Sequence, residues 1–113
     1  MKVIDVYQQY FPAECPWNGT ARRAASVKLT AESEEGTVRY TVSVSFFPHS
    51  DPEDYAVPDD AYAERELYRE KGHRSRKRER AFLEDIRETA GGLAASLGGE
   101  IDWENPLREA RWG

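Results

Sequence analysis

The sequence predicts an α+β fold in two layers, with an antiparallel sheet of three to four strands built on a central hairpin and one long helix packed across it. Two observations support this prediction. Apolar and polar residues alternate with a period of two in the stretch 22–47, and apolar residues recur at spacings of three and four in the stretch 76–97. The chain has 113 residues, which suits a single domain over residues 1–113 with one hydrophobic core.

The stretch 22–47 has the pattern of a β-hairpin. Its first half alternates Val27, Leu29 and Ala31 with polar residues. Its second half alternates polar residues with five apolar ones, which are Val38, Tyr40, Val42, Val44 and Phe46. Such alternation is typical of strands that are buried on one face. Gly36 lies between the two halves, where a hairpin loop needs a residue that adopts positive φ.

The residues before the hairpin have a less decisive pattern. Residues 3–11 fit a short helix with an apolar stripe, and they also fit a strand, because so short a segment does not separate the two periods. We favour the helix. Pro12 and Pro16 interrupt regular structure, so residues 12–21 are predicted to form a loop in which Trp17 covers the edge of the core.

The residues after the hairpin predict an irregular segment and then a surface helix. Three prolines are expected to keep residues 48–59 extended. Asp59 is placed to cap a helix over residues 61–71, whose acidic first turn complements the positive end of the helix dipole. The apolar stripe of this helix is narrow, so we expect it to lie on the surface.

A longer helix is predicted over residues 76–97. Its apolar residues form one stripe that should cover the hairpin, and they are Phe82, Ile86, Ala90, Leu93, Ala94 and Leu97. Glycines at 91–92 fit a close approach to the sheet or a kink, and glycines at 98–99 should end the helix. Residues 100–104 then predict an edge strand, and residues 107–111 a final helical turn.

The composition limits the class of protein. The net charge is −5 at pH 7, which argues against a protein that coats nucleic acid by overall charge. The single cysteine, Cys15, excludes an internal disulfide, and no apolar run reaches the roughly 20 residues that a membrane span needs. Because no apolar leader follows Met1, we expect a reducing, cytoplasmic location without membrane contact.

Candidate catalytic or metal-binding groups are few. Imidazole, carboxylate and thiol chemistry could come from His49, Asp51, Asp54, Asp59, Asp60, His73 and Cys15, but their spacing matches no metal-ligand or nucleophile pattern. No glycine-rich phosphate loop joins a strand to a helix. We therefore expect no enzyme activity, no cofactor and no metal, and a metal-dependent hydrolase at His49 and Asp51 is the least favoured alternative.

Charge is segregated between two consecutive segments. The acidic segment, residues 51–66, contains the candidate contact residues Asp51, Glu53, Asp54, Tyr55, Asp59, Asp60 and Tyr62. The basic segment, residues 71–80, contains the candidates Arg74, Arg76, Lys77, Arg78 and Arg80. Carboxylates beside tyrosines suit the basic patch of a partner, and clustered bases at a helix start suit phosphates or carboxylates. Two other interpretations stay open: the segments pair with each other, or the acidic one is a solvated loop.

The expected function is that of a small non-enzymatic protein-binding module that acts through one of these charged segments. One setting that fits the small size, the acidity and the lack of catalytic motifs is an inhibitor from a phage or mobile element. Such an inhibitor, of the anti-CRISPR type, would block a host nucleic-acid-binding complex. The alternative is a nucleic-acid-binding module that uses the basic segment, for which binding should weaken steeply with salt.

Overall fold

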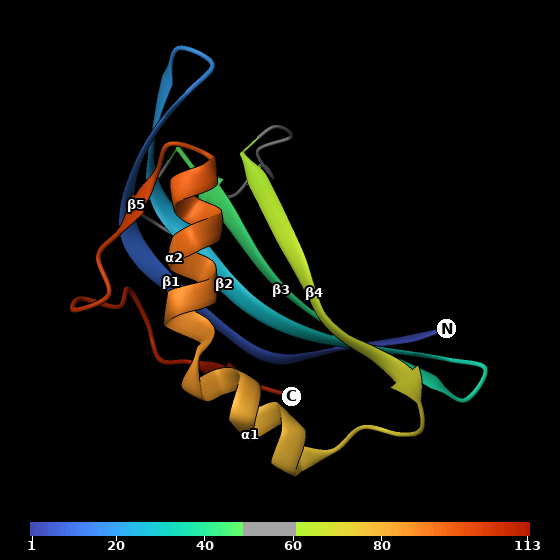
Figure 1. Cartoon of the computed structure of the whole chain (residues 1–113). Coiled ribbons are helices and arrows are strands. Elements are labelled where there is room, and N and C mark those ends of the chain that lie inside the picture. Colours follow the sequence, from blue (N-terminus) through green and yellow to red (C-terminus); the bar gives the residue numbers. More distant parts are fainter. Residues whose placement is uncertain (49–60) are drawn as a thin grey trace.

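The computed structural model describes residues 1–48 and 61–113 and has an α+β fold (Figure 1). Four long strands come first, followed by two helices and two short strands. The long strands are β1 (Lys2–Trp17), β2 (Thr20–Glu34), β3 (Thr37–Phe47) and β4 (Tyr62–Lys71). The helices are α1 (Arg76–Glu84) and α2 (Ile86–Ser96), and the short strands are β5 (Glu100–Ile101) and β6 (Arg111–Trp112).

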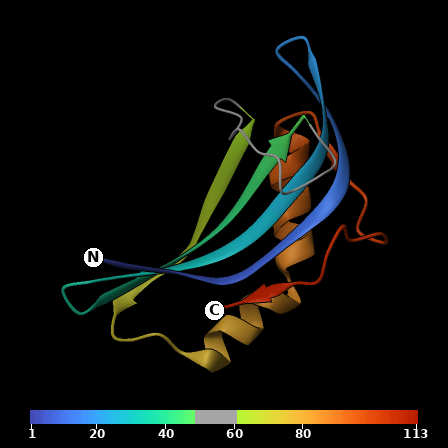
Figure 2. The same cartoon turned by 180° about the vertical axis from the view of Figure 1, so that it is seen from behind.

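The strands form one curled antiparallel sheet in the order β4-β3-β2-β1-β5, and β6 pairs with β1. The sheet bends around α2, which lies against its concave face, while α1 lies at one end of the molecule (Figures 1 and 2). The predicted α+β class with an antiparallel sheet and helical cover is therefore correct. Among the described residues the sheet has six strands rather than three to four, and two helices replace the single long one.

The predicted hairpin is confirmed as the β2–β3 pair. The two strands pair along their full length, with Leu29 opposite Val42, and both side chains are fully buried on the concave face. Val44 is also fully buried, as the alternation predicted. The turn consists of Glu35 and Gly36, with φ angles of 50° and 76°. Positive φ at both residues gives the twist that a two-residue hairpin turn requires.

β1 corrects the interpretation of the first 17 residues. The helix predicted at 3–11 is wrong, and most of the loop predicted at 12–21 is strand as well. The physical reason is a register shift between Asp5 and Tyr7, which breaks the period of two. Ile4 lies opposite Ala31 of β2, and Tyr7 lies opposite Leu29, the next inward-facing residue. Two successive inward positions of β1 are therefore three residues apart, which is also a spacing typical of a helix.

The β1–β2 connection is tighter than predicted. Asn18 and Gly19 form its turn, with φ angles of 47° and 74°. Asn-Gly is the pair best suited to two consecutive positive φ angles, so these residues direct a hairpin rather than a long loop. Trp17 is half-buried and packs against the core, as expected.

β4 corrects the prediction of a helix at 61–71. This segment is rich in helix-forming Glu, Arg and Leu, yet it pairs with β3 from Tyr62 to Lys71. Pairing with a complete buried strand supplies backbone hydrogen bonds that outweigh a local preference of a few tenths of a kcal/mol per residue. The many charges of the segment suit a strand at the edge of a sheet.

The predicted helix at 76–97 is divided at Asp85, whose φ and ψ angles of −106° and 6° separate α1 from α2. The break does not fall at the glycine pair 91–92. A Cβ placed on either glycine would meet nothing within 4 Å, so a close approach to the sheet does not explain them. Gly98 has a φ of 77° and follows the end of α2, which confirms the predicted stop.

The C-terminal residues add two short strands to β1. Glu100 and Ile101 pair with β1, which confirms the edge strand predicted at 100–104 in its first two residues. The final helical turn predicted at 107–111 is wrong, because Arg111 and Trp112 form β6. β5 pairs with Ala13 and Glu14 of β1, and β6 pairs with Tyr7 and Gln8 of the same strand.

The core lies between the concave face of the sheet and α2. Ile86, Ala90 and Ala94 of α2 are buried against it, which is the face that the apolar stripe predicted. Phe11 meets Trp103 edge-on with ring centroids 4.9 Å apart, and this contact closes the β1 side of the core. Within the described residues, neither helix is long and apolar enough to cross a membrane.

Candidate partner-binding surfaces

A buried charged cluster joins the start of α1 to the sheet. Glu79 is only 5% exposed, and its carboxylate accepts a hydrogen bond of 2.6 Å from the Tyr40 hydroxyl. The guanidinium of Arg74 donates two more, from Nε at 3.0 Å and from Nη2 at 2.9 Å. The Tyr40 hydroxyl in turn accepts from the backbone N–H of Ser75 at 3.0 Å. Each buried polar group of the cluster therefore has a partner.

The ionisation of this cluster follows from its contacts. Burial acts to raise the pKa of the Glu79 carboxyl, but the bonds from Arg74 and Tyr40 outweigh burial and hold the pKa below its usual value. Burial and the bond to Glu79 raise the pKa of the Tyr40 hydroxyl. The bond to Glu79 also raises the pKa of Arg74. Arg74, a predicted contact residue, is therefore used to hold the fold together.

Arg78 is also used within the chain. Its guanidinium carbon lies 4.1 Å from the centroid of the Tyr68 ring on β4, which is a cation–π contact. Its backbone N–H donates to Ser75 Oγ at 3.2 Å, so Ser75 is the N-cap of α1. Two of the five predicted basic contact residues, Arg74 and Arg78, thus stabilise the junction between β4 and α1.

The other three predicted basic residues remain available. Arg76, Lys77 and Arg80 are exposed on α1. None of their side chains forms a hydrogen bond or ion pair within residues 1–48 and 61–113, although the charge of Arg76 helps to lower the pKa of Glu79. We call these three residues the basic face of α1. No ion pair joins Arg76, Lys77 or Arg80 to Glu64 or Glu66, and the other carboxylates of the acidic segment lie outside the described residues.

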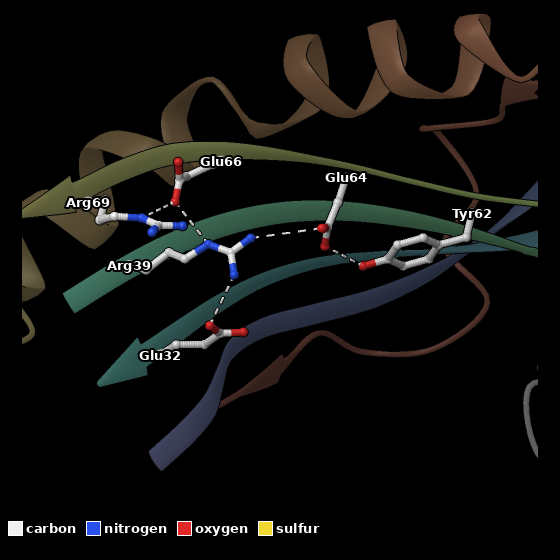
Figure 3. Close-up of polar contacts among 6 residues, drawn as sticks. All are labelled: Glu32, Arg39, Tyr62, Glu64, Glu66 and Arg69. Atoms are coloured by element: carbon white, nitrogen blue, oxygen red, sulfur yellow. Dashed lines mark hydrogen bonds and ion pairs between the residues drawn. The ribbon is translucent and has the colours of Figure 1, made fainter. Parts of the chain in front are cut away.

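Most of the predicted acidic contact residues fall outside the described residues. These are Asp51, Glu53, Asp54, Tyr55, Asp59 and Asp60. Tyr62 is described, and its side chain is 46% exposed at the start of β4. Its hydroxyl donates to Glu64 at 2.8 Å, which orients the carboxylate along the convex face of the sheet (Figure 3).

The carboxylates that follow Tyr62 are largely neutralised. Arg39 on β3 lies among two of them, Glu64 and Glu66, and the carboxylate of Glu32 on β2, as Figure 3 shows. It is 3.2 Å from Glu32 on β2, 3.8 Å from Glu64 and 2.9 Å from Glu66. Arg69 donates to Glu66 at 2.7 Å and lowers the pKa of that carboxyl. The described end of the acidic segment is thus a mixed-charge network rather than a free acidic surface.

The candidate catalytic groups do not come together where the structure describes them. His49 and Asp51 lie outside the described residues. His73 is exposed between β4 and α1, and no three His, Cys, Asp or Glu side chains of the described residues are placed to hold a metal. Cys15 is 1% exposed, and burial raises the pKa of its thiol, so it is held in its protonated, unreactive form.

Sequence reasoning missed two residues that organise these surfaces. Glu79 is the one acidic residue in the run 74–80. A single acid among so many bases was the available signal that it forms an ion pair with one of them. Arg39 is the one basic residue between Ala31 and Phe47, among alternating apolar residues, and it marks the polar face of β3. In both cases the partners come from other strands, which a local pattern does not reveal.

Comparison of the chain with protein-family models, curated proteins and solved structures finds no match.

Proposed function

We propose that this chain is a non-enzymatic protein-binding module whose basic face of α1 contacts carboxylates on a partner. The observation that supports the proposal is that some bases of the basic segment contact the rest of the chain while others are exposed. Arg74 and Arg78 are used internally, whereas the basic face is exposed and has no ion-pair partner within the described residues. The cluster of Tyr40, Glu79 and Arg74 holds α1 in place, so the three free bases are presented on a rigid element.

The local electrostatics favour an anionic partner. Arg76 and Lys77 occupy the first turn of α1, where the helix dipole already places positive potential. Cations at this end oppose the dipole, so the free protein carries an unfavourable interaction that an incoming carboxylate would relieve. Arginine suits this role because its planar guanidinium forms paired hydrogen bonds with a carboxylate.

A protein partner is favoured over a nucleic acid by the extent of the basic face. Binding to a phosphate backbone grows with the number of phosphates neutralised, and three bases on two helical turns neutralise few. The chain as a whole carries a net charge of −5, so a polyanion is repelled by the surface outside this face. The nucleic-acid-binding alternative uses the same three residues and is distinguished by experiment.

The more specific role as an anti-CRISPR-like inhibitor keeps the protein-binding module but replaces the contact surface, and its partner is a host nucleic-acid-binding complex. The basic grooves of such complexes would be met by carboxylates, so this variant uses the acidic segment. Its test is substitution of Tyr55, Asp59, Asp60 and Tyr62 together, which should release the complex. Retention of a captured complex after that substitution would refute it.

The main test is affinity capture with the basic face reversed. The variant Arg76→Glu, Lys77→Glu, Arg80→Glu should lose the captured protein. A control with the same change in net charge, Lys2→Glu, Arg23→Glu, Arg111→Glu, should retain it, because these exposed bases lie on β1, β2 and β6.

Nuclease treatment separates the two partner classes. Capture that survives nuclease and depends on the basic face supports the proposal. Capture lost with nuclease supports the nucleic-acid-binding alternative. Equal capture by both triple variants would refute a role for the basic face.

A further inference from the structure

Among the described residues, β4 is the outer strand of the sheet and has one unpaired edge. It pairs with β3 on one side, and no described residue forms backbone pairing with its other side. The unpaired N–H and C=O groups of such an edge form a template for another strand. Figure 1 shows that α2 lies across the concave face and leaves this edge at the margin of the molecule. An added strand would therefore meet open backbone groups.

A bulge in β4 fixes which side chains share a face. Tyr40 lies opposite Tyr68 and Thr41 opposite Glu66, so Leu67 is an extra residue in β4. Without it, Glu66 and Arg69 would point to opposite faces, because side chains alternate along a strand.

With the bulge, Glu64, Glu66, Arg69 and Lys71 all lie on the convex face, while Arg65 and Glu70 lie on the concave face. The two halves of the strand are therefore arranged symmetrically about the bulge.

The charges are also arranged symmetrically, with opposite signs. Counting outward from the bulge, the pairs of equivalent positions are Glu66 with Arg69, Arg65 with Glu70, and Glu64 with Lys71. Each pair combines an acid with a base, and both members of each pair lie on the same face. A strand with this order is complementary to a second copy of itself that runs in the opposite direction.

We propose that two copies of this chain dimerise by antiparallel pairing of their β4 edges, with the two-fold axis at the Leu67–Tyr68 bulge. The same residues then meet twice, as an isologous interface requires. Glu66 faces the Arg69 of the second copy, Arg65 faces its Glu70, and Glu64 faces its Lys71. Backbone hydrogen bonds join the two sheets, and cross-strand ion pairs select this partner and register.

The charge pattern selects the register strongly. If the second strand slides by two residues in either direction, each strand keeps only one opposite-charge pair, Glu64 with Arg69 or Glu66 with Lys71. In the single chain, Glu64 and Glu66 contact Arg39, and Arg69 contacts Glu66. The other three charged residues, Arg65, Glu70 and Lys71, are exposed and form no ion pair within the described residues, so they are free to meet the second copy.

The test uses sedimentation equilibrium of the full chain over a concentration series. The wild type should move from a mass near 12.9 kDa to twice that value as concentration rises. Arg65→Glu places two glutamates opposite each other on both sides of the two-fold axis, and Glu70→Arg places two arginines there. Each variant should weaken the dimer at least about tenfold.

Mixing the two variants supplies the decisive control. The Arg65→Glu strand carries acids at positions 65 and 70, and the Glu70→Arg strand carries bases at both, so an equimolar mixture should form a heterodimer. The double variant Arg65→Glu, Glu70→Arg should again dimerise with itself. Because neither side chain forms an ion pair within the described residues, unchanged near-ultraviolet circular dichroism is expected for every variant.

Three results would overturn the proposal. They are a wild type that stays monomeric up to about 1 mM, a dimer that Arg65→Glu does not weaken, and a mixture in which the two variants stay apart. Since the basic face of α1 is not part of this interface, its reversal should leave the dimer intact, and the two proposals fail independently.

Discussion

The Tyr40 hydroxyl on β3 donates a hydrogen bond of 2.6 Å to the Glu79 carboxylate on α1, across 39 residues of chain. Both side chains are almost completely buried. The Tyr40 ring also packs on Phe82 with centroids 5.3 Å apart, so one side chain contributes both apolar and polar contacts to the same helix. This pair determines where α1 meets the sheet and therefore where the basic face points.

Removal of the Tyr40 hydroxyl should destabilise the protein. In Tyr40→Phe, Glu79 loses a donor and the Ser75 N–H loses its acceptor, while the ring contacts stay in place. The expected loss is about 1–3 kcal/mol of unfolding free energy, measured by chemical denaturation. Tyr68→Phe is the matched control, because the Tyr68 hydroxyl forms no hydrogen bond within the described residues, and it should be close to neutral. Equal losses in both variants would contradict the role assigned to the Tyr40 hydroxyl.

The Glu79 carboxyl should make the stability of the fold depend on acid pH. Its pKa in the folded state is depressed below the usual value of 4.5, so its contribution is complete above that value. The contribution is lost as the pH falls through the lower, folded pKa. The difference in unfolding free energy between wild type and Glu79→Gln should be constant above about pH 5.5 and shrink below about pH 4.5. A difference that stays constant down to about pH 2.5 would show that Glu79 is not an ionised partner of Arg74.

The strands that sequence reasoning recovered are those without irregularities. β2 and β3 pair without a register shift, so their period of two is intact from Ala24 to Phe47 and the alternation was readable. β1 and β4 each contain at least one shift, which moves the inward-facing positions from one parity to the other. A bulge is set by the pairing of two strands, and a single segment carries no direct signal of it.

The position of the basic candidate surface was predictable from the sequence. Which of its residues are exposed and unpaired among the described residues was less predictable. The run of bases at 74–80 was visible in the sequence, and α1 does present part of it to solvent. Which bases are free was not visible, because Arg74 depends on Glu79 and Tyr40, and Arg78 depends on Tyr68. The pattern placed these tyrosines in a strand and in a helix, so their polar roles had no local signal.

A basic residue at the start of α1 should be unfavourable for stability. Lys77 lies in the first turn and forms no ion pair within the described residues. Lys77→Glu replaces a cation at the positive end of the helix dipole with an anion and should stabilise the fold by about 0.3–1 kcal/mol at low salt. Thermal unfolding at two salt concentrations should show the gain and its screening. Lys2→Glu, at the start of β1, has no helix dipole to meet and should give no comparable gain. Destabilisation by Lys77→Glu would indicate that this residue serves the fold rather than a partner.

Two glycines near the C-terminal end of the fold should respond in opposite ways to the same substitution. A Cβ on Gly99 would lie 2.6 Å from Cζ of the buried Phe46 ring and 3.0 Å from Cβ of Cys15, so Gly99→Ala forces packed groups apart. The expected cost is about 1–3 kcal/mol. Gly92 is helical and exposed, and nothing lies within 4 Å of the position that a Cβ would take, so Gly92→Ala should stabilise α2. The expected gain is about 0.5–1 kcal/mol.

Chemical denaturation of the two glycine variants checks both signs at once. A neutral Gly99→Ala would mean that Phe46 can move aside. In that case the contact between Gly99, which follows α2, and Phe46 of β3 does not limit how closely α2 packs on the sheet.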